Sequence, residues 1–264
     1  MNRKSVSPII STVILTAIML TITFLTIGFA ITVFAIQSDT TEFEQAKNVM
    51  TNFAGIIDYV SSKQGSSAYV KFNSRSGGPQ FLENSGEITV NVDGTKVLDG
   101  SISLLKYRGG SLSSVAGKYY LRGTDEIIVV NNTFPLGSVY VEQANGAYVI
   151  LDFSRINVAN LGTFQFYSGK GGQGNPIFEK VNLIQINFVN LTKGVFYGSG
   201  SLYAVATCEK VNITYYRISK GPNTLTITAS SAGQTTSVVN LSVDTNCDTI
   251  VMVTVSNVKV SVIG

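Results

Sequence analysis

Residues 5–38 read SVSPIISTVILTAIMLTITFLTIGFAITVFAIQS, a stretch without a single charged side chain. As a helix, its apolar part would be about 40 Å long, which exceeds the roughly 30 Å of hydrocarbon in a bilayer. Arg3 and Lys4 precede the stretch, and Asp39 follows it. By the positive-inside rule, the N-terminus stays cytoplasmic and everything after Asp39 lies outside the cell. The sequence therefore predicts one membrane span that carries an extracellular body.

Three interpretations compete for this stretch. A secretory signal peptide has an apolar core of about 7–15 residues before a small-residue cleavage site, and Val-Phe-Ala at 33–35 would fit such a site. The apolar core here is about twice too long for that class. A plain membrane anchor fits the length. The third interpretation, a cleaved leader followed by an assembling helix, depends on the residues around Ser5.

The residues around Ser5 carry a family resemblance. Arg-Lys-Ser at 3–5 is followed by Val-Ser-Pro-Ile-Ile at 6–10 and then by the apolar stretch. This order resembles archaeal type IV prepilins, whose short basic leader is cut on the cytoplasmic side before a Val-Ser-Pro-Val-Ile start. Ile10 stands where bacterial pilins carry a glutamate, which favours the archaeal branch. The matched motif is short, so it identifies a class of secretion and assembly and says little about the head.

The resemblance implies a route from membrane to filament. Residues 1–5 form a basic leader, which a prepilin peptidase removes between Ser5 and Val6. The subunit waits in the membrane until assembly machinery builds it into a helical homo-oligomer, in which neighbouring helices replace lipid. Pro8 suits the first turn of such a helix, because its missing N–H would be unpaired there anyway. The residues expected to carry assembly are Val6, Pro8, Ile9, Ile10, Ile14, Leu15, Ile18, Leu20, Phe24, Leu25, Phe29 and Phe34.

The helix is expected to continue beyond the membrane, over residues 6–64. Apolar residues recur at three- and four-residue steps through residues 43–60, which makes one stripe on an otherwise polar helix. The stripe packs against the protein's own head, against neighbouring helices in a filament, or against both. A threonine at 40 or 41 would cap a fresh helix, and the alternative is one continuous helix with a bend near Ser38. The stripe consists of Phe43, Ala46, Val49, Met50, Phe53, Ile56, Ile57 and Val60.

After Gly65, a helix stop signal, the pattern changes to short β-branched and aromatic runs separated by turn signals. Asp-Gly at 93–94 and Asn-Gly at 145–146 are candidates for two-residue hairpin turns. The predicted fold class is α+β, with a long N-terminal hydrophobic helix followed by a β-rich, sandwich-like extracellular head over residues 65–264. The head is either one extended unit or two subdomains divided near residue 172.

Two later segments have specific interpretations. The glycine-rich residues 169–176 lack the Lys-Ser/Thr that completes a phosphate-binding loop, so we interpret them as a surface loop or a joint within the head. The final strand, expected over residues 249–262, belongs either to the head's own sheet or to an edge shared between subunits.

Composition argues against an enzyme or a nucleic-acid partner. The absence of histidine removes the usual general base, the commonest metal ligand and the Ser-His and Cys-His nucleophile arrangements. The acidic residues have no spacing typical of a glycosidase or a calcium loop, so we expect no catalytic residue, metal or cofactor. A net charge of +3, without a Lys/Arg cluster after the N-terminus, is too small to indicate a nucleic-acid-binding surface, so we expect no nucleic-acid partner.

An extracellular location leads to two further predictions. Cys208 and Cys247 would form one structural disulfide, with buried free thiols as the alternative. Four Asn-x-Ser/Thr sequons fit a secreted surface. The expected N-glycosylation sites are Asn131, Asn190, Asn212 and Asn240.

Three functional hypotheses follow. The favoured one is a structural subunit of a cell-surface filament for adhesion or motility, polymerised through its N-terminal helix. The second is a non-polymerising, membrane-anchored binding protein or a minor pilin, which a binding pocket in the head would favour. The third, a secreted enzyme, is the least favoured because no nucleophile or metal motif is present.

Overall fold

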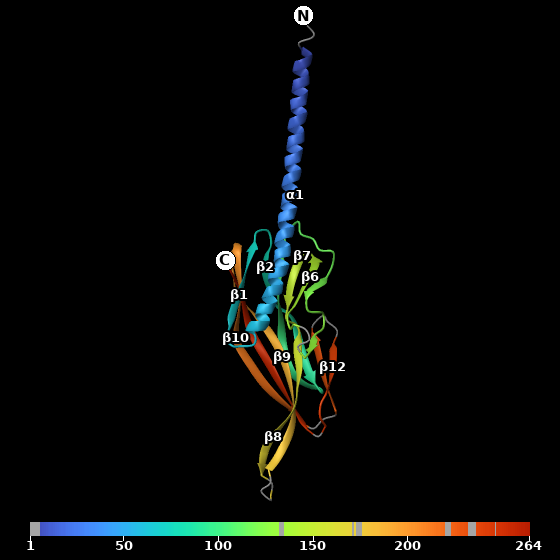
Figure 1. The fold of residues 1–264 in the computed structure, drawn as a ribbon, viewed down its shortest axis with the longest axis vertical. Coiled ribbons are helices and arrows are strands. Elements are labelled where there is room, and N and C mark those ends of the chain that lie inside the picture. The colour runs from blue at the N-terminus through green and yellow to red at the C-terminus, as the bar shows by residue number, and fades with distance from the viewer. Residues whose placement is uncertain are drawn as a thin grey trace.

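A computed structural model describes residues 6–131, 135–170, 172, 176–219, 223–231, 236–245 and 247–264, without the side chains of residues 6–9, 170 and 176. Figure 1 shows a long helix that rises from an elongated head of β-strands, with the N-terminal end of the helix far from the head. The predicted fold class is confirmed, since one long apolar helix precedes a β-rich, sandwich-like domain.

The helix, α1 (Val6–Val60), runs without a break. The hydroxyls of Thr40 and Thr41 donate to carbonyls one turn earlier, so neither threonine caps a fresh helix. One continuous helix is therefore the correct alternative, and it ends at Val60 rather than at residue 64. Gly65 follows in the left-handed region, with φ 81°, and its N–H donates to the carbonyl of Cys208 at 2.8 Å.

The described strands form two sheets. The first has the order β1-β10-β13-β9-β8-β5, comprising β1 (Ser67–Ser74), β10 (Gly200–Ile218), β13 (Asp248–Ile263), β9 (Pro176–Phe196), β8 (Ile156–Lys170) and β5 (Ile128–Val130). The second has the order β12-β11-β2-β3-β7-β6-β4, comprising β12 (Ser237–Ser242), β11 (Thr224–Ser231), β2 (Gly78–Val92), β3 (Thr95–Arg108), β7 (Gly146–Asp152), β6 (Ser138–Ala144) and β4 (Tyr119–Arg122). Neighbours are antiparallel except β13–β9 and β5–β8, which are parallel.

The apolar stripe of α1 packs against the protein's own head. Its residues form one core with strands of both sheets, and Val49 and Ile56 pack against that core at its edge. Burying a side chain such as Phe53 or Ile57 in full stabilises the fold by about 1.5–3 kcal/mol. The stripe therefore packs inside the subunit. Its buried members are Phe43, Ala46, Met50, Phe53, Ile57 and Val60.

A second core lies where the two sheets pack directly on each other, without the helix between them. Side chains from alternate strand positions interdigitate there, as in other β-sandwiches. The head is therefore helix-filled in one part and a plain sandwich in the other. Buried members of this second core include Ile88, Val92, Ile156, Ile186, Ile227 and Val253.

The two predicted hairpin turns have different outcomes. Asp93 and Gly94 have φ of 46° and 78° between the paired residues Val92 and Thr95, which is the predicted two-residue turn. At 143–147 the hairpin exists, but the two-residue turn is wrong because Ala144 pairs with Gly146. A type I′ turn needs positive φ at both central residues, and among residues 144–147 only Gly146 has it, at 129°.

The C-terminal strand belongs to the head's own sheet. β13 lies between β10 and β9 and is paired on both sides, so it is not an edge open to another subunit. Gly172 lies between β8 and β9, in the connection of one hairpin. Strands from before and after this residue occur in both sheets.

Candidate functional site

The N-terminal part of α1 projects beyond the head as a bare apolar rod (Figure 1). Phe24, Phe29 and Phe34 are 70%, 73% and 70% exposed. Val6, Pro8 and Ile9 lie on the helix without a description of their side chains, and Ser5 lies outside the described residues. Every other residue predicted to carry assembly is also exposed: Ile10, Ile14, Leu15, Ile18, Leu20 and Leu25.

The polar atoms of this rod are largely satisfied within it. Threonine hydroxyls donate to the backbone carbonyl four residues earlier, at 2.8–3.1 Å. A hydroxyl bonded in this way needs no water, so these hydroxyls can enter lipid or a bundle of helices already paired. Within the described residues, α1 is the one helix that is long and apolar enough to cross a membrane. The threonines concerned are Thr16, Thr21, Thr23, Thr26 and Thr32.

Glu42 attaches the helix to the head where the rod begins. Its carboxylate accepts a 2.6 Å hydrogen bond from the Tyr107 hydroxyl and bonds from the backbone N–H groups of Arg75, Ser76 and Gly77 at 3.0–3.3 Å. Burial raises the pKa of Glu42, but these hydrogen bonds, led by that from Tyr107, outweigh burial and hold the pKa below its ordinary value. The carboxylate therefore stays ionised and fixes a loop of the head against α1.

Asp39 makes a similar attachment one turn earlier. Its Oδ2 accepts the backbone N–H of Leu112 at 3.1 Å, and its carbonyl accepts the Ser113 hydroxyl at 3.3 Å. The sequence suggested only that the acidic residues after the membrane span face outward. The missed signal is spacing, because Asp39 precedes Phe43 by four residues and so lies on the same face as the stripe.

Asp58 attaches the other end of the helix. It forms an ion pair with Arg122, and its Oδ1 accepts the backbone N–H of Gly137 at 3.2 Å. Burial raises the pKa of Asp58 to about 6, although the positive charge of Arg122 acts in the opposite direction. Arg122 also donates to the carbonyl of Thr51, so one guanidinium joins two turns of α1 to β4.

A polar cavity of about 670 Å³ lies next to Asp58, between the end of α1 and the sheets. Amides line it in a chain: Gln185 donates to Asn187 at 2.8 Å, and Asn187 donates to Asn157 at 3.3 Å. Thr254, Ser61 and Ser62 also line it. The cavity can therefore accommodate an uncharged ligand with several hydroxyl or amide groups.

The structure corrects the predicted disulfide. Both cysteines are buried free thiols, which is the alternative that the sequence left open. Cys208 pairs with Val258 on β13, whereas Cys247 precedes Asp248 at the start of that strand. At about 3.3 Å per residue, the two cysteines are roughly 30 Å apart, far beyond the 4.4–6.8 Å between Cα atoms that a disulfide spans.

The predicted glycosylation sites lie in different environments. Asn131 and Asn240 are exposed, and Asn190 and Asn212 are half-buried on strands. The side-chain amide of Asn190 donates to Asn257 on the neighbouring strand at 2.9 Å, so it is already engaged within the sheet.

Comparison of the chain with protein-family models, with curated proteins and with solved structures found no match. The functional proposal therefore depends on the residues and geometry described above.

Proposed function

We propose that this chain is a structural subunit of an extracellular filament of the archaeal type IV pilus kind, assembled through the exposed part of α1. The supporting observation is the bare rod, which carries large exposed apolar side chains on every side between Ile10 and Phe34. An exposed apolar surface of this extent needs lipid or protein around it. The N-terminal motif favours lipid first and neighbouring helices afterwards.

The division of α1 into two parts supports an assembling role. The apolar face from Phe43 to Val60 is buried in the core of the head. None of the described residues before Asp39 belongs to either core. Asp39 and Glu42 hold the helix at the boundary. A head fixed rigidly on such a rod would keep a constant position relative to the helical core of a filament.

The test separates assembly from simple anchoring. Replacing Phe24 and Phe29 with alanine removes two exposed rings but leaves a helix that is still apolar enough for a bilayer. A plain anchor tolerates this change, whereas packed helices lose contacts. We expect cells that produce the Phe24→Ala/Phe29→Ala variant to keep the protein in the membrane but to yield fewer filaments than the wild type. Those filaments should disassemble at a lower temperature than wild-type filaments.

Phe24→Leu is the matched control and should leave filament yield nearly unchanged. Equal yield and equal heat resistance in the alanine variant would contradict assembly through this surface.

A second candidate function is a membrane-anchored binding protein, and the polar cavity favours it. Its amide and hydroxyl lining suits a monosaccharide or a similar uncharged ligand. This candidate predicts that the full-length protein in detergent binds a monosaccharide in calorimetry and that Asn187→Ala abolishes binding. If no neutral sugar in a panel gave a heat of binding, the binding-protein function would be ruled out.

A further inference from the structure

The apolar rod of α1 leads into the head without a spacer. The helix runs unbroken across the boundary, and Asp39 is the first residue along it that is bonded to the head. Asp39 lies about 25 Å along the helix from Ile22, the middle of the apolar residues 8–36. The headgroup region of a bilayer ends roughly 20–22 Å from the bilayer centre. When the rod spans a bilayer, the base of the head therefore lies at the outer surface of the lipid headgroups.

The loop that follows β3 presents an apolar side chain at this base. Residues 109–117 carry no charged side chain, and Leu112 within them is 46% exposed. The backbone N–H of Leu112 donates to Asp39 at 3.1 Å, so the loop is held at a fixed height on α1. Gly110 packs so closely on Asp39 that an added Cβ would lie 2.3 Å from Oδ2. An exposed apolar tip on an uncharged loop suits the boundary between lipid headgroups and acyl chains.

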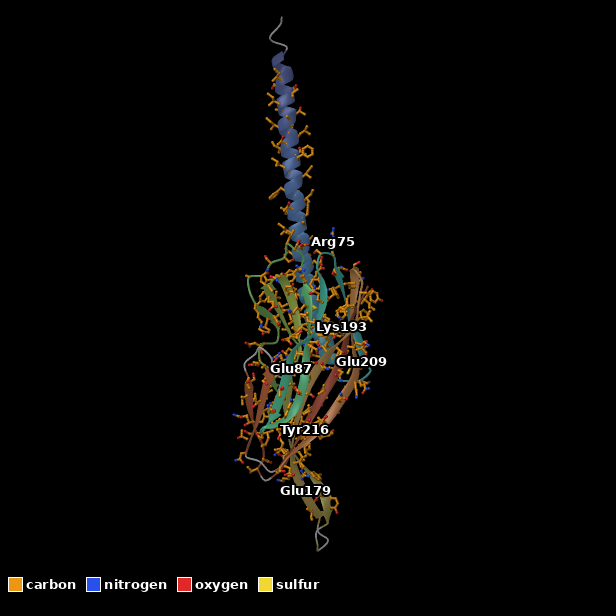
Figure 2. The ribbon with its side chains drawn as sticks, turned by 180° about the vertical axis from the view of Figure 1, so that it is seen from behind. Arg75, Glu87, Glu179, Lys193, Glu209 and Tyr216 are labelled. Carbon is orange, nitrogen blue, oxygen red and sulfur yellow. The ribbon has the colours of Figure 1, made fainter. Side chains whose placement is uncertain are left out.

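The charge available at the base of the head is positive. Figure 2 shows Arg75 beside the base of the rod. Arg108 is close by, because it pairs with Gly78, three residues after Arg75. Both arginines are exposed, and neither forms an ion pair with another described residue. The acids of this region, Asp39 and Glu42, are already bonded to backbone N–H groups of the head. Arginines in this position attract the phosphates of anionic lipids.

We infer that the base of the head is a lipid-binding surface, which seats the head on the outer face of the bilayer before assembly. Leu112 enters the headgroup region, and Arg75 and Arg108 bind lipid phosphates. The surface is continuous with the rod, which lipid surrounds in this state, and this continuity selects lipid over a protein partner. The inference rests on the membrane-inserted stage of the proposed function and adds a second lipid contact to that of the rod.

Fluorescence quenching by nitroxide-labelled lipids tests the contact. Full-length protein with a fluorophore on Leu112→Cys is placed in vesicles of phosphatidylcholine and phosphatidylglycerol that contain these lipids. We expect the label to be quenched. A label on Tyr215→Cys should not be, because Tyr215 is 64% exposed on β10, next to Tyr216, which Figure 2 places far from the rod. A label on Phe24→Cys reports insertion of the rod itself. The native thiols are buried and should take up little label.

Removing the two arginines tests the contribution of charge. Arg75→Gln/Arg108→Gln should reduce quenching of the Leu112→Cys label in vesicles that contain phosphatidylglycerol, and added salt should reduce it without the arginine changes. Lys63→Gln/Lys210→Gln is the matched control, since it removes the same charge from two exposed lysines near the far end of α1. Equal loss of quenching from the two double variants would contradict the role of the arginines.

The remaining outcomes separate this contact from the proposed function. Quenching at Leu112→Cys no greater than at Tyr215→Cys, with the Phe24→Cys label quenched, would overturn the lipid contact and leave the proposed function intact. A Leu112→Cys label that is shielded from aqueous iodide but not quenched by lipid would place another copy of the chain on this surface, and would also overturn it. An unquenched Phe24→Cys label would overturn both the contact and the membrane stage of the proposed function.

Discussion

At the scale of single residues, three acids on α1 determine how the helix is held. Asp39, Glu42 and Asp58 each bond to a different loop or strand of the head, and each lies beside the buried stripe. The stripe could be predicted from its three- and four-residue spacing alone. The acids could not, because their partners come from loops more than thirty residues away in the chain, such as Arg75 and Leu112.

Replacing Glu42 with glutamine should destabilise the head. The carboxylate has two acceptor oxygens for the Tyr107 hydroxyl and three backbone N–H groups, whereas an amide has one acceptor and places an NH₂ group against donors. We expect a loss of about 1–3 kcal/mol in the free energy of unfolding, measured by urea denaturation in detergent. Glu44→Gln is the control, since Glu44 is exposed and pairs with Lys47 on the same helix. Equal effects of the two changes would contradict the role of Glu42.

Asp58 should make stability depend on pH. Its pKa is raised in the folded state to about 6, so the folded protein binds this proton more tightly than the unfolded chain does. The stabilisation is complete below pH 4 and is lost as the pH rises through 6, amounting to roughly 2–3 kcal/mol. We expect Asp58→Asn to flatten the unfolding free energy between pH 4 and 6. An unchanged slope in that variant would contradict the raised pKa.

At the scale of elements, α1 combines two helices of different character without a break. The absence of charged residues predicted the rod, and the three- and four-residue spacing of apolar residues predicted the stripe. Both signals can be read from neighbouring residues in the sequence. The order of strands was not predictable, since β9 lies between β13 and β8 through pairings that span the chain. The prediction of a two-residue turn at 145–146 was wrong because an Asn-Gly pair permits a type I′ turn but does not impose it.

Alanine substitutions in the two parts of α1 should have different effects on head stability and on filament strength. Phe53 is fully buried in the core, so Phe53→Ala should lower the free energy of unfolding of the head by about 3–5 kcal/mol. Tyr59→Ala is the control on the same helix, because Tyr59 is 76% exposed. Phe24→Ala should leave head unfolding unchanged while weakening filaments. A comparable loss of head stability from Phe24→Ala would contradict the division of the helix.

At the scale of the whole molecule, the subunit is an elongated body with an apolar rod at one pole and, at the other, an aromatic hairpin formed by the ends of β8 and β9 (Figure 1). Neither the hairpin's projection nor its distance from the rod follows from the sequence, because both depend on where β13 and β5 stop pairing with β9 and β8. The predicted disulfide failed for the same reason. An even number of cysteines in an extracellular domain suggested a disulfide, but the register of β10 and β13 places the two cysteines far apart.

The free thiols lead to a direct prediction. Under denaturing conditions without reductant, a maleimide reagent should label both Cys208 and Cys247, and in the folded protein it should label them slowly because both are buried. Mass spectrometry of unreduced peptides that found Cys208 joined to Cys247 would contradict the strand register.

The most direct test of the filament account is electron microscopy of material sheared from the producing cells, combined with N-terminal sequencing of the subunit. We expect filaments whose subunit begins at Val6, with the rod of α1 retained. A monomer that stays in the membrane fraction and begins at Met1 or Asn2 would contradict both processing and assembly, and the membrane-anchored binding protein would then be the better account.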